Sequence, residues 1–298
     1  MLKSLAIVGA GRVGRALGRR LREEGWKIGA IVTRSEGSAQ RAARFIGAGK
    51  PCVGMTRQIL AAPLVLIAVP DDEIAGVDRE LARIGGEELQ GKVVLHTSGA
   101  LDSRVLSATK QSGASVGSMH PLQTFTGKNV PSLEGKIIAV EGDVRAVRVA
   151  RQMARSLGGS PALIPGEKKV LYHAAAAMAA GHVLAVEESA TQLLVSLGMG
   201  RREAVHALLS LTRQVLENFE QFGPHAAWTG PLSRSDYHTV AAHLQSLRDS
   251  SEEFSSAYQA LNQLAARVLA QDPAGMLTEL EKISSEIKPK AKGKGNNA

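Results

Sequence analysis

The sequence is poor in aromatic residues and in cysteine, and it lacks a long apolar run. Aromatic side chains make up 3% of the 298 residues, so within a hydrophobic content of 44% the core has to consist of Ala, Val, Leu and Ile. The single cysteine, Cys52, excludes an internal disulfide framework and is typical of a reducing compartment, so we expect a cytoplasmic protein. The longest apolar run, residues 59–70, contains a proline and is too short to span a bilayer, so we expect no membrane association.

Patterns typical of metal sites and of serine hydrolases are also missing. The histidines and acidic residues show no metal-ligand spacing, so we predict no metal ion, and Gly-x-Ser-x-Gly is absent. The net charge of +8 comes partly from residues 288–298, which hold four lysines and no acid. We expect this segment to be a disordered, solubilising tail. Because no aromatic residue lies between its lysines, we expect no specific nucleic-acid binding.

A glycine-rich turn stands near the start of the chain. The strand-like residues 5–8 lead directly into Gly9-Ala10-Gly11-Arg12-Val13-Gly14, and a helical pattern follows. In this spacing the first glycine allows a tight turn, the second lets the backbone approach a pyrophosphate, and the third lets the helix pack on the strand. The N–H groups and the dipole of the helix favour a phosphate there. The six residues predict a dinucleotide-binding loop, and the alternative is a merely tight strand–helix turn.

The end of the second predicted strand bears on which dinucleotide would bind. Residues 27–32 lead into Thr33-Arg34-Ser35, where an NAD-selective site would carry an acidic residue for the ribose hydroxyl. A guanidinium and two hydroxyl groups instead suit a 2′-phosphate, because guanidinium binds phosphate through a bidentate pair of hydrogen bonds. We therefore predict NADP as the cofactor. The alternative is that Arg34 is only a solvated charge at the end of a strand.

The pattern of apolar residues divides the chain into two domains and a tail. Strand-like runs alternate with helical patterns up to residue 160, which favours a parallel sheet covered by helices on both faces. Beyond Pro161 only helical patterns follow, with one long helix at 166–198 that is interrupted near Gly181. The fold class is therefore α/β: an N-terminal Rossmann dinucleotide-binding domain at 1–160, followed by an all-α domain at 161–287 for substrate binding and dimerisation. Strands are expected at 5–8, 28–32, 64–69, 93–95, 116–119 and 137–140, and later helices at 202–222, 236–247, 251–270 and 273–287.

Polar residues follow three of the predicted strands, where ligands of open α/β sheets collect. Val69 and Pro70 are predicted to bind the cofactor, and Asp71 and Asp72, which follow them, either bind a ligand or cap the next helix. Ser98 is predicted to bind cofactor and substrate, or else to cap the helix that begins near residue 102. His120 is predicted to orient a carbonyl group or to carry a proton, with a purely structural histidine as the alternative.

Two further clusters lie in the helical half. Lys169 and His173 are four residues apart and so share one helix face. Reduction of a carbonyl or imine leaves negative charge that needs a proton donor, and both residues are predicted to be catalytic. Arg234 is predicted to bind an anionic group of the substrate together with Asp236. The alternatives are a solvated Lys169 with a structural His173, and an Arg234–Asp236 pair that clamps its own loop.

Taken in order, these motifs resemble those of a family of Rossmann-like proteins with a C-terminal helical domain of unknown function. That family is related to pyrroline-5-carboxylate reductase, ketopantoate reductase and the β-hydroxyacid dehydrogenases. The resemblance covers about residues 4–285. It is carried by the glycine-rich loop, Ala68-Val69-Pro70-Asp71-Asp72, His96-Thr97-Ser98-Gly99-Ala100, Ser118-Met119-His120-Pro121-Leu122-Gln123-Thr124-Phe125, Lys169-Val170-Leu171-Tyr172-His173-Ala174-Ala175-Ala176, and Thr229-Gly230-Pro231 with Arg234 and Asp236.

The resemblance implies an NADP-dependent oxidoreductase that forms a homodimer through its helical domain. We expect it to reduce a small 2-oxo acid such as ketopantoate, or a cyclic imine, in a cleft between the domains. The sequence departs from the β-hydroxyacid relatives at His173, which stands where they have asparagine, and Gly181 and Ser235 depart from related members. These departures concern the substrate and not the cofactor. The alternative function is a non-catalytic NADP(H)-binding redox sensor or assembly protein.

Overall fold

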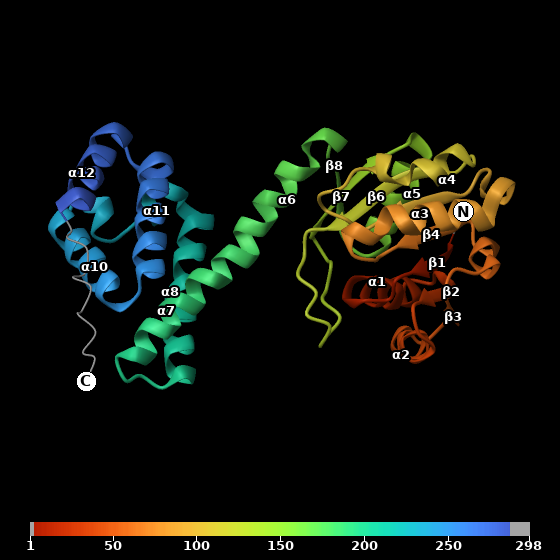
Figure 1. Ribbon diagram of the computed structural model, residues 1–298, viewed down its shortest axis with the longest axis horizontal. Helices are drawn as coiled ribbons and strands as arrows, with labels where there is room; N and C mark the ends of the chain where they lie inside the picture. Colours follow the sequence, from red (N-terminus) through yellow and green to blue (C-terminus); the bar gives the residue numbers. More distant parts are fainter. Residues whose placement is uncertain (1–2, 287–298) are drawn as a thin grey trace, which may run out of the picture. The chain divides into compact units, whose positions relative to one another are not determined.

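The computed structural model describes residues 3–286 and consists of two compact units that meet between His182 and Val183 (Figure 1). The sequence placed the boundary near residue 160. The structure assigns a further strand at Ser160–Leu163, which pairs with the sheet, and a further helix at Lys169–Ala177 to the first unit. The predicted tail at 288–298 lies outside the described residues.

The first unit is built on one eight-stranded sheet with the order β3-β2-β1-β4-β5-β6-β7-β8. All neighbouring strands are parallel except β6 and β7, which are antiparallel. The sheet is therefore mixed, whereas strand–helix alternation predicted a parallel one. The strands are β1 (Ser4–Val8), β2 (Lys27–Thr33), β3 (Lys50–Val53), β4 (Leu64–Ile67), β5 (Val93–His96), β6 (Ser115–Pro121), β7 (Ile137–Gly142) and β8 (Ser160–Leu163).

Helices cover both faces of this sheet because its central strands are apolar on both sides. Alternate residues of a strand point to opposite faces. Leu5 and Ile7 join a core with α1, α2 and α5, whereas Ala6 and Val8 join a second core with α3 and neighbouring short helices. The helices of the unit are α1 (Arg12–Glu23), α2 (Glu36–Ile46), α3 (Asp71–Gly85), α4 (Ser107–Gln111), α5 (Val144–Ser156) and α6 (Lys169–Ala177), with 3₁₀ turns at Arg57–Ala61, Gly86–Leu89, Ser103–Leu106 and Gly166–Lys168.

The sequence analysis did not predict the two edge strands, β3 and β8, and each contains a proline. In β3 the N–H of Gly54 donates to the carbonyl of Thr33, and beside β8 the N–H of Ile164 donates to that of Val140. Because backbone groups alternate in direction along a strand, Pro51 and Pro161 hold the positions that face away from the sheet. Short strands with proline have a weak sequence signal, which explains why the pattern did not reveal them.

The second unit is helical, as predicted. Its core is formed by Leu232 together with residues of α10, α11 and α12, among them Val240, Ala266 and Leu280, and these three helices lie beside one another (Figure 1). The helices are α7 (Val183–Ser196), α8 (Arg201–Phe222), α9 (Pro224–Ala227), α10 (Tyr237–Ser250), α11 (Glu252–Leu269) and α12 (Pro273–Glu286), with a 3₁₀ turn at Leu232–Arg234.

The long helix expected at 166–198 is present, and its irregularity falls where the sequence placed it. A π-helical turn at Met178–His182 separates α6 from α7 and includes Gly181. Within the described part of the chain, the helical run Gly166–Ser196 alone meets the length and composition test for a membrane span, with a mean hydropathy of 1.3 and an unburied apolar window. The sequence expectation of no membrane segment considered only uninterrupted apolar runs, whereas many alanines raise the mean hydropathy of this helix.

Candidate functional site

The three glycines of the N-terminal loop lie as their spacing predicts. Gly9 has a φ of +83°, which favours glycine, and a Cβ there would lie 2.5 Å from Cγ1 of Val69. A Cβ at Gly14 would collide with the carbonyl oxygen of Gly9, so α1 packs directly against the turn. Beside Gly11, in contrast, a Cβ would meet nothing within 4 Å. The loop is closely packed at Gly9 and Gly14. It is open beside Gly11, at the N-terminus of α1, where a phosphate fits.

A hollow of about 550 Å³ opens beside this loop at the carboxyl ends of β1, β2 and β4. Of the predicted cofactor residues, it is lined by Gly9, Ala10, Gly11, Thr33, Arg34, Ser35, Val69 and Pro70. The remaining ones do not line it: Val13 packs against the core, Gly14 is buried under the turn, and Arg12 is exposed at the first position of α1. Eight of the twelve predicted cofactor residues thus line the hollow, and Arg12, Val13, Gly14 and Ser98 do not.

Arg34 lies at the solvent rim of this hollow. Its guanidinium donates to the Glu73 carboxylate over 3.0 Å, and the Arg34 side chain is 88% exposed. An ion pair so exposed contributes at most about 1 kcal/mol, so an incoming phosphate can replace Glu73 at small cost. The hydroxyl of Thr33 donates to the carbonyl of Ser35, and the hydroxyl of Ser35 donates to that of Ser38.

The hydroxyl of Ser98 is already fully used within the protein. It donates to the Asp71 carboxylate over 2.7 Å and accepts from the N–H groups of Ala100 and Leu101. Ser98 is also buried. The structure therefore gives Ser98 a role in the turn that follows β5 and not the predicted direct contact with cofactor or substrate. The predicted cap is wrong as well, because Asp102 caps the 3₁₀ turn that begins at Ser103. Asp71 lies in the first turn of α3 and makes no capping hydrogen bond to that helix.

A second hollow, of about 510 Å³, lies between the end of β6 and the face of α6. Five alanines of α6 and of the π-helical turn form one part of its wall. Two histidines and a tyrosine lie together in the rest of it. Its lining consists of His120, Leu122, Gln123, Thr124, Tyr172, His173, Ala175, Ala176, Ala177, Ala179 and Ala180. An apolar hollow with a few convergent polar groups is the usual form of a small-molecule site.

Among the polar residues of this second hollow, two histidines and a tyrosine contact one another. Nδ1 of His120 lies 2.9 Å from the hydroxyl of Tyr172, and the two rings meet edge to face. The rings of His120 and His173 are also edge to face, with centroids 5.7 Å apart. A Cβ at Gly99 would lie 2.5 Å from the ring of His173 and 2.8 Å from Nε2 of His120, so only glycine leaves room for both rings.

Lys169 does not reach this hollow, contrary to its predicted catalytic contact. Its side chain is 1% exposed, and its ammonium donates to the carbonyl of Ser98 over 2.8 Å and to the hydroxyl of Ser118 over 2.5 Å. The Glu141 carboxylate lies 3.9 Å away. The reason is position: Lys169 is the first residue of α6 and points towards the sheet, one helical turn before Tyr172 and His173. It is neither solvated nor available to a ligand.

Burial and the nearby ammonium set the protonation of the site. Burial, and then the charges of His173 and Lys169, lower the pKa of His120 from 6.5 to about 4, so its ring is neutral at pH 7. Burial raises the pKa of the Tyr172 hydroxyl to about 12, which keeps its proton in place. Burial lowers the pKa of Lys169 to about 8, against the opposing effect of Glu141, Asp102 and Asp71.

Arg234 and Asp236 belong to the second unit, whereas Lys169 and His173 belong to the first. Asp236 caps α10, because its carboxylate accepts from the N–H of Thr239 over 3.1 Å and from the Thr239 hydroxyl over 2.7 Å. This role accounts for Asp236 without a ligand and corrects its assignment to substrate binding. Arg234 is exposed on the 3₁₀ turn before it. Their charges interact, since Arg234 contributes to the lowered pKa of Asp236.

Sequence reasoning missed Tyr172, Gly99, Ser118 and Glu141. A signal existed for Tyr172: it is three residues after Lys169 and next to His173, so all three share a helix face. No local signal existed for Ser118 and Glu141, because their closeness to Lys169 arises from the neighbouring positions of β6 and β7. Within residues 3–286, no group of three or more His, Cys, Asp or Glu residues could hold a metal ion.

Comparison with known families agrees with this architecture. Residues 2–121 match the profile of a Rossmann-like domain, and residues 136–265 match that of a domain of unknown function, DUF2520. The chain thus resembles a Rossmann-like domain in its first part and a DUF2520 domain in its later part. The predicted resemblance and the predicted fold class are thus confirmed. No curated protein matches the chain.

Several solved structures share the fold. BF3122 of Bacteroides fragilis, named a candidate NADP oxidoreductase, is 20% identical with a TM-score of 0.73, over 88% of this chain and 98% of its own. Protein TM1727 of Thermotoga maritima is 25% identical with a TM-score of 0.64, over 93% and 98%. The reductive aminase of Aspergillus terreus, solved with NADPH and ethyl-5-oxohexanoate, is 17% identical with a TM-score of 0.66, over 90% and 94%. At such identities the likeness describes the fold.

The lowered pKa of His120 predicts that acid destabilises the protein. Between pH 6.5 and about 4 the unfolded chain binds a proton at this histidine and the folded chain does not, so stability is full above pH 6.5 and is lost towards pH 4. His120 should contribute at most about 1.4 kcal/mol per pH unit in this window. Thermal unfolding from pH 7 to 4 measures the slope, which His120→Asn should flatten. His243→Asn removes a histidine with a similar tyrosine partner and serves as control; equal flattening would contradict the prediction.

Proposed function

We propose that this protein is an NADP(H)-dependent oxidoreductase that reduces the C=O or C=N group of a small 2-oxo acid or cyclic imine. The observation that carries the proposal is the paired Tyr172 and His120 in an apolar hollow of the unit that also bears the dinucleotide loop. The fold agrees with it, because solved structures of this fold are named as an NADP oxidoreductase and as a reductive aminase with NADPH. Among 2-oxo acids, ketopantoate is our leading substrate.

The residues around the first hollow fit a phosphorylated dinucleotide. The open space beside Gly11 and the N-terminus of α1 accept the diphosphate, and Arg34 with the Ser35 hydroxyl accepts a 2′-phosphate. Glu73 is held by Arg34, so its charge is partly neutralised where a ribose phosphate would lie. When bound, NADPH supplies the hydride for the reduction.

Tyr172 would provide the proton that the reduced oxygen or nitrogen needs. Its raised pKa keeps the hydroxyl protonated across the neutral range, and its position in the lining makes the hydroxyl accessible from the hollow. With Nδ1 protonated, neutral His120 would donate to the oxygen of Tyr172, which leaves the tyrosine proton free to pass to the substrate. His173 packs against His120 and lines the same hollow, where it orients the substrate.

Lys169 would act as a positioning residue and not as the acid. Its ammonium joins the first turn of α6 to groups that follow β5 and lie on β6 and β7. The same positive charge helps to keep His120 neutral. Both effects reach the substrate through other side chains.

The exposed guanidinium of Arg234 stays our candidate for binding a carboxylate of the substrate. This part of the proposal predicts that Arg234→Gln raises KM for an acidic substrate more than it lowers kcat.

We propose that a second copy of this chain covers the long helix. Apolar side chains along the run Gly166–Ser196 are exposed, among them Leu171 at 74%, Met178 at 52% and Leu184 at 69%. A membrane is disfavoured because Glu187 contacts Thr212 and Glu188 pairs with Arg201, and carboxylates inside a bilayer are costly.

We also propose a cytoplasmic location. It is supported by Cys52, a buried free thiol on the edge strand β3. The chain has no second cysteine with which Cys52 could form a disulfide.

The role of Tyr172 is tested by Tyr172→Phe, which removes one oxygen. NADPH oxidation is measured with ketopantoate, pyrroline-5-carboxylate, short 2-oxo acids and cyclic imines. We expect kcat to fall about 100-fold or more, because general acid catalysis contributes about that much, with an unchanged Kd for NADPH.

The second unit offers a matched control for this substitution. Tyr258 meets His243 with the same 2.9 Å contact and a similar edge-to-face geometry. Tyr258→Phe should leave kcat unchanged. Equal activity of the two variants would remove Tyr172 from the mechanism. NADPH binding without turnover of any panel member would instead favour the redox sensor or assembly protein.

The preference for NADPH is tested at Arg34. Arg34→Asp should weaken NADPH binding about 10- to 100-fold, because a bidentate charge-assisted contact is lost and a repulsive charge is added. NADH binding should stay the same or improve. Fluorescence titration gives both Kd values without any substrate. The control is Arg83→Asp, which makes the same change of charge at an exposed position of α3. An unaltered ratio of the NADPH and NADH Kd values in Arg34→Asp would count against the assignment.

The homodimer is tested by the mass of the protein in solution. We expect light scattering to give twice the chain mass for the wild type, and a shift towards the monomer for Leu184→Glu, because a carboxylate would be buried between the copies. Val53→Glu, at a 50% exposed position on β3, should stay dimeric. A monomeric wild type, or one that is extracted only with detergent, would contradict this proposal.

A further inference from the structure

Helix α5 carries an unusual concentration of one charge. Its thirteen residues, Val144–Ser156, include four arginines and no acid. Three of them, Arg148, Arg151 and Arg155, line a shallow hollow of about 500 Å³ together with Gly142, Val144, Val147 and Leu163. No acidic residue is part of this lining. We call these seven residues the α5 groove.

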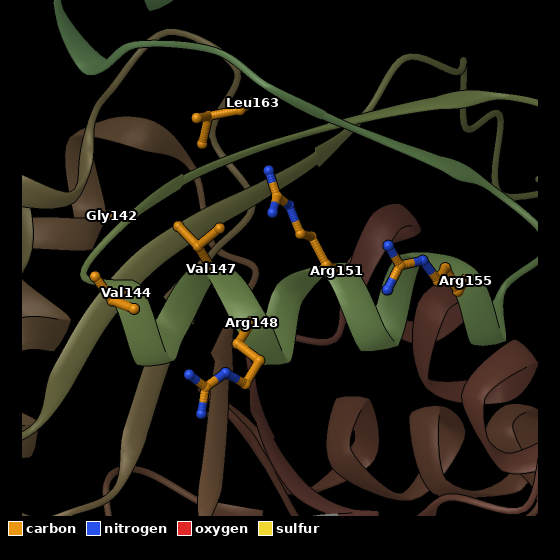
Figure 2. A pocket seen from close by; sticks show the side chains of 7 residues that line it. All are labelled: Gly142, Val144, Val147, Arg148, Arg151, Arg155 and Leu163. Atoms are coloured by element: carbon orange, nitrogen blue, oxygen red, sulfur yellow. The ribbon is translucent and has the colours of Figure 1, made fainter.

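The positive charge of the α5 groove is not neutralised within the described chain. Across residues 3–286, the salt bridges that form involve none of the four α5 arginines. Arg151 and Arg155 are four residues apart and so are neighbours on the helix surface, where like charges repel. Figure 2 shows both projecting on the side of Leu163, and Arg148 projecting from the other side of the helix. An anionic ligand would relieve this repulsion.

The rest of the groove is apolar and exposed. Val144 is 79% exposed and Leu163 is 56% exposed, and both flank the arginines. Arginine is enriched at protein interfaces, and the exposed aliphatic side chains beside it add apolar area that a partner can cover. A small molecule would leave most of Val144 in water, whereas a polypeptide that lies along α5 would cover it. The combination therefore favours a peptide with both carboxylates and apolar side chains.

We propose that the α5 groove binds an acidic segment of a partner protein in which aspartate or glutamate alternates with aliphatic or aromatic residues. The carboxylates pair with Arg148, Arg151 and Arg155, and the apolar side chains pack on Val144 and Leu163. The groove shares no lining residue with the two hollows described above, so it gives the protein a docking function separate from its reaction.

The proposal is tested with a displayed library of random twelve-residue peptides, selected on the full-length wild-type protein. We expect the enriched peptides to combine acidic and apolar residues. Synthetic copies carrying a fluorophore are then titrated by anisotropy. Arg151→Gln with Arg155→Gln should weaken their binding about tenfold, because two charge-assisted contacts are lost, and higher salt should weaken wild-type binding.

The control is another arginine pair at the same spacing, Arg79 and Arg83, exposed on α3. Arg79→Gln with Arg83→Gln should bind the peptides as the wild type does, and Leu163→Ser should weaken binding without changing its salt dependence. The proposal is overturned if no acidic peptides are enriched, or if both double variants lose binding equally. It is also overturned if the α5 variant becomes monomeric, since a second copy would then cover the groove, or if RNA or anionic vesicles bind there and the peptides do not.

Discussion

The arrangement of the candidate site depends on one buried ammonium. Lys169 binds the carbonyl of Ser98 after β5 and the hydroxyl of Ser118 on β6, and it lies near the carboxylate of Glu141 on β7. These groups belong to three neighbouring strands, so a single side chain fixes the start of α6 against the sheet. Tyr172 and His173 follow one turn later on the same face of α6. Their positions relative to the sheet therefore depend on the contacts of Lys169.

Such an attachment is costly in isolation, and here two hydrogen bonds and a nearby carboxylate offset part of the cost. Burial of an unpaired ammonium costs several kcal/mol, which hydrogen bonds and an opposite charge have to offset. Glu141 supplies the charge at a distance, and its own second contact is the hydroxyl of Ser103. The remaining imbalance shows in the lowered pKa of Lys169. Its charge extends to the hollow, where it helps to keep His120 uncharged and therefore able to share a proton with Tyr172.

The sequence was sufficient for the features that local spacing determines. The conformation of the glycine loop follows from a short pattern with one mechanical solution, and the change from alternating strands and helices to helices alone shows in the pattern of apolar residues. The boundary between the two units does not, since it lies at 182–183 and not near 160. The roles of Lys169 and Ser98 were predicted less well, because the same residue types serve a ligand or the protein itself. Which of the two holds depends on strands that are distant in sequence and adjacent in the sheet, as Ser118 and Glu141 are to Lys169. Asp236 shows the same limit, since only the backbone geometry of α10 reveals it as a cap.

The prolines of the two edge strands restrict how the protein can assemble. Pro51 and Pro161 stand at positions where a neighbouring strand would require an N–H donor, and proline has none. A further strand could join either side of the sheet only by leaving one of its own carbonyl groups unbonded. Continuous intermolecular sheets are thereby disfavoured, and association is directed to helical surfaces. The two edge strands have only four residues each, which adds to this protection, so the sheet is not readily extended by strands of other molecules.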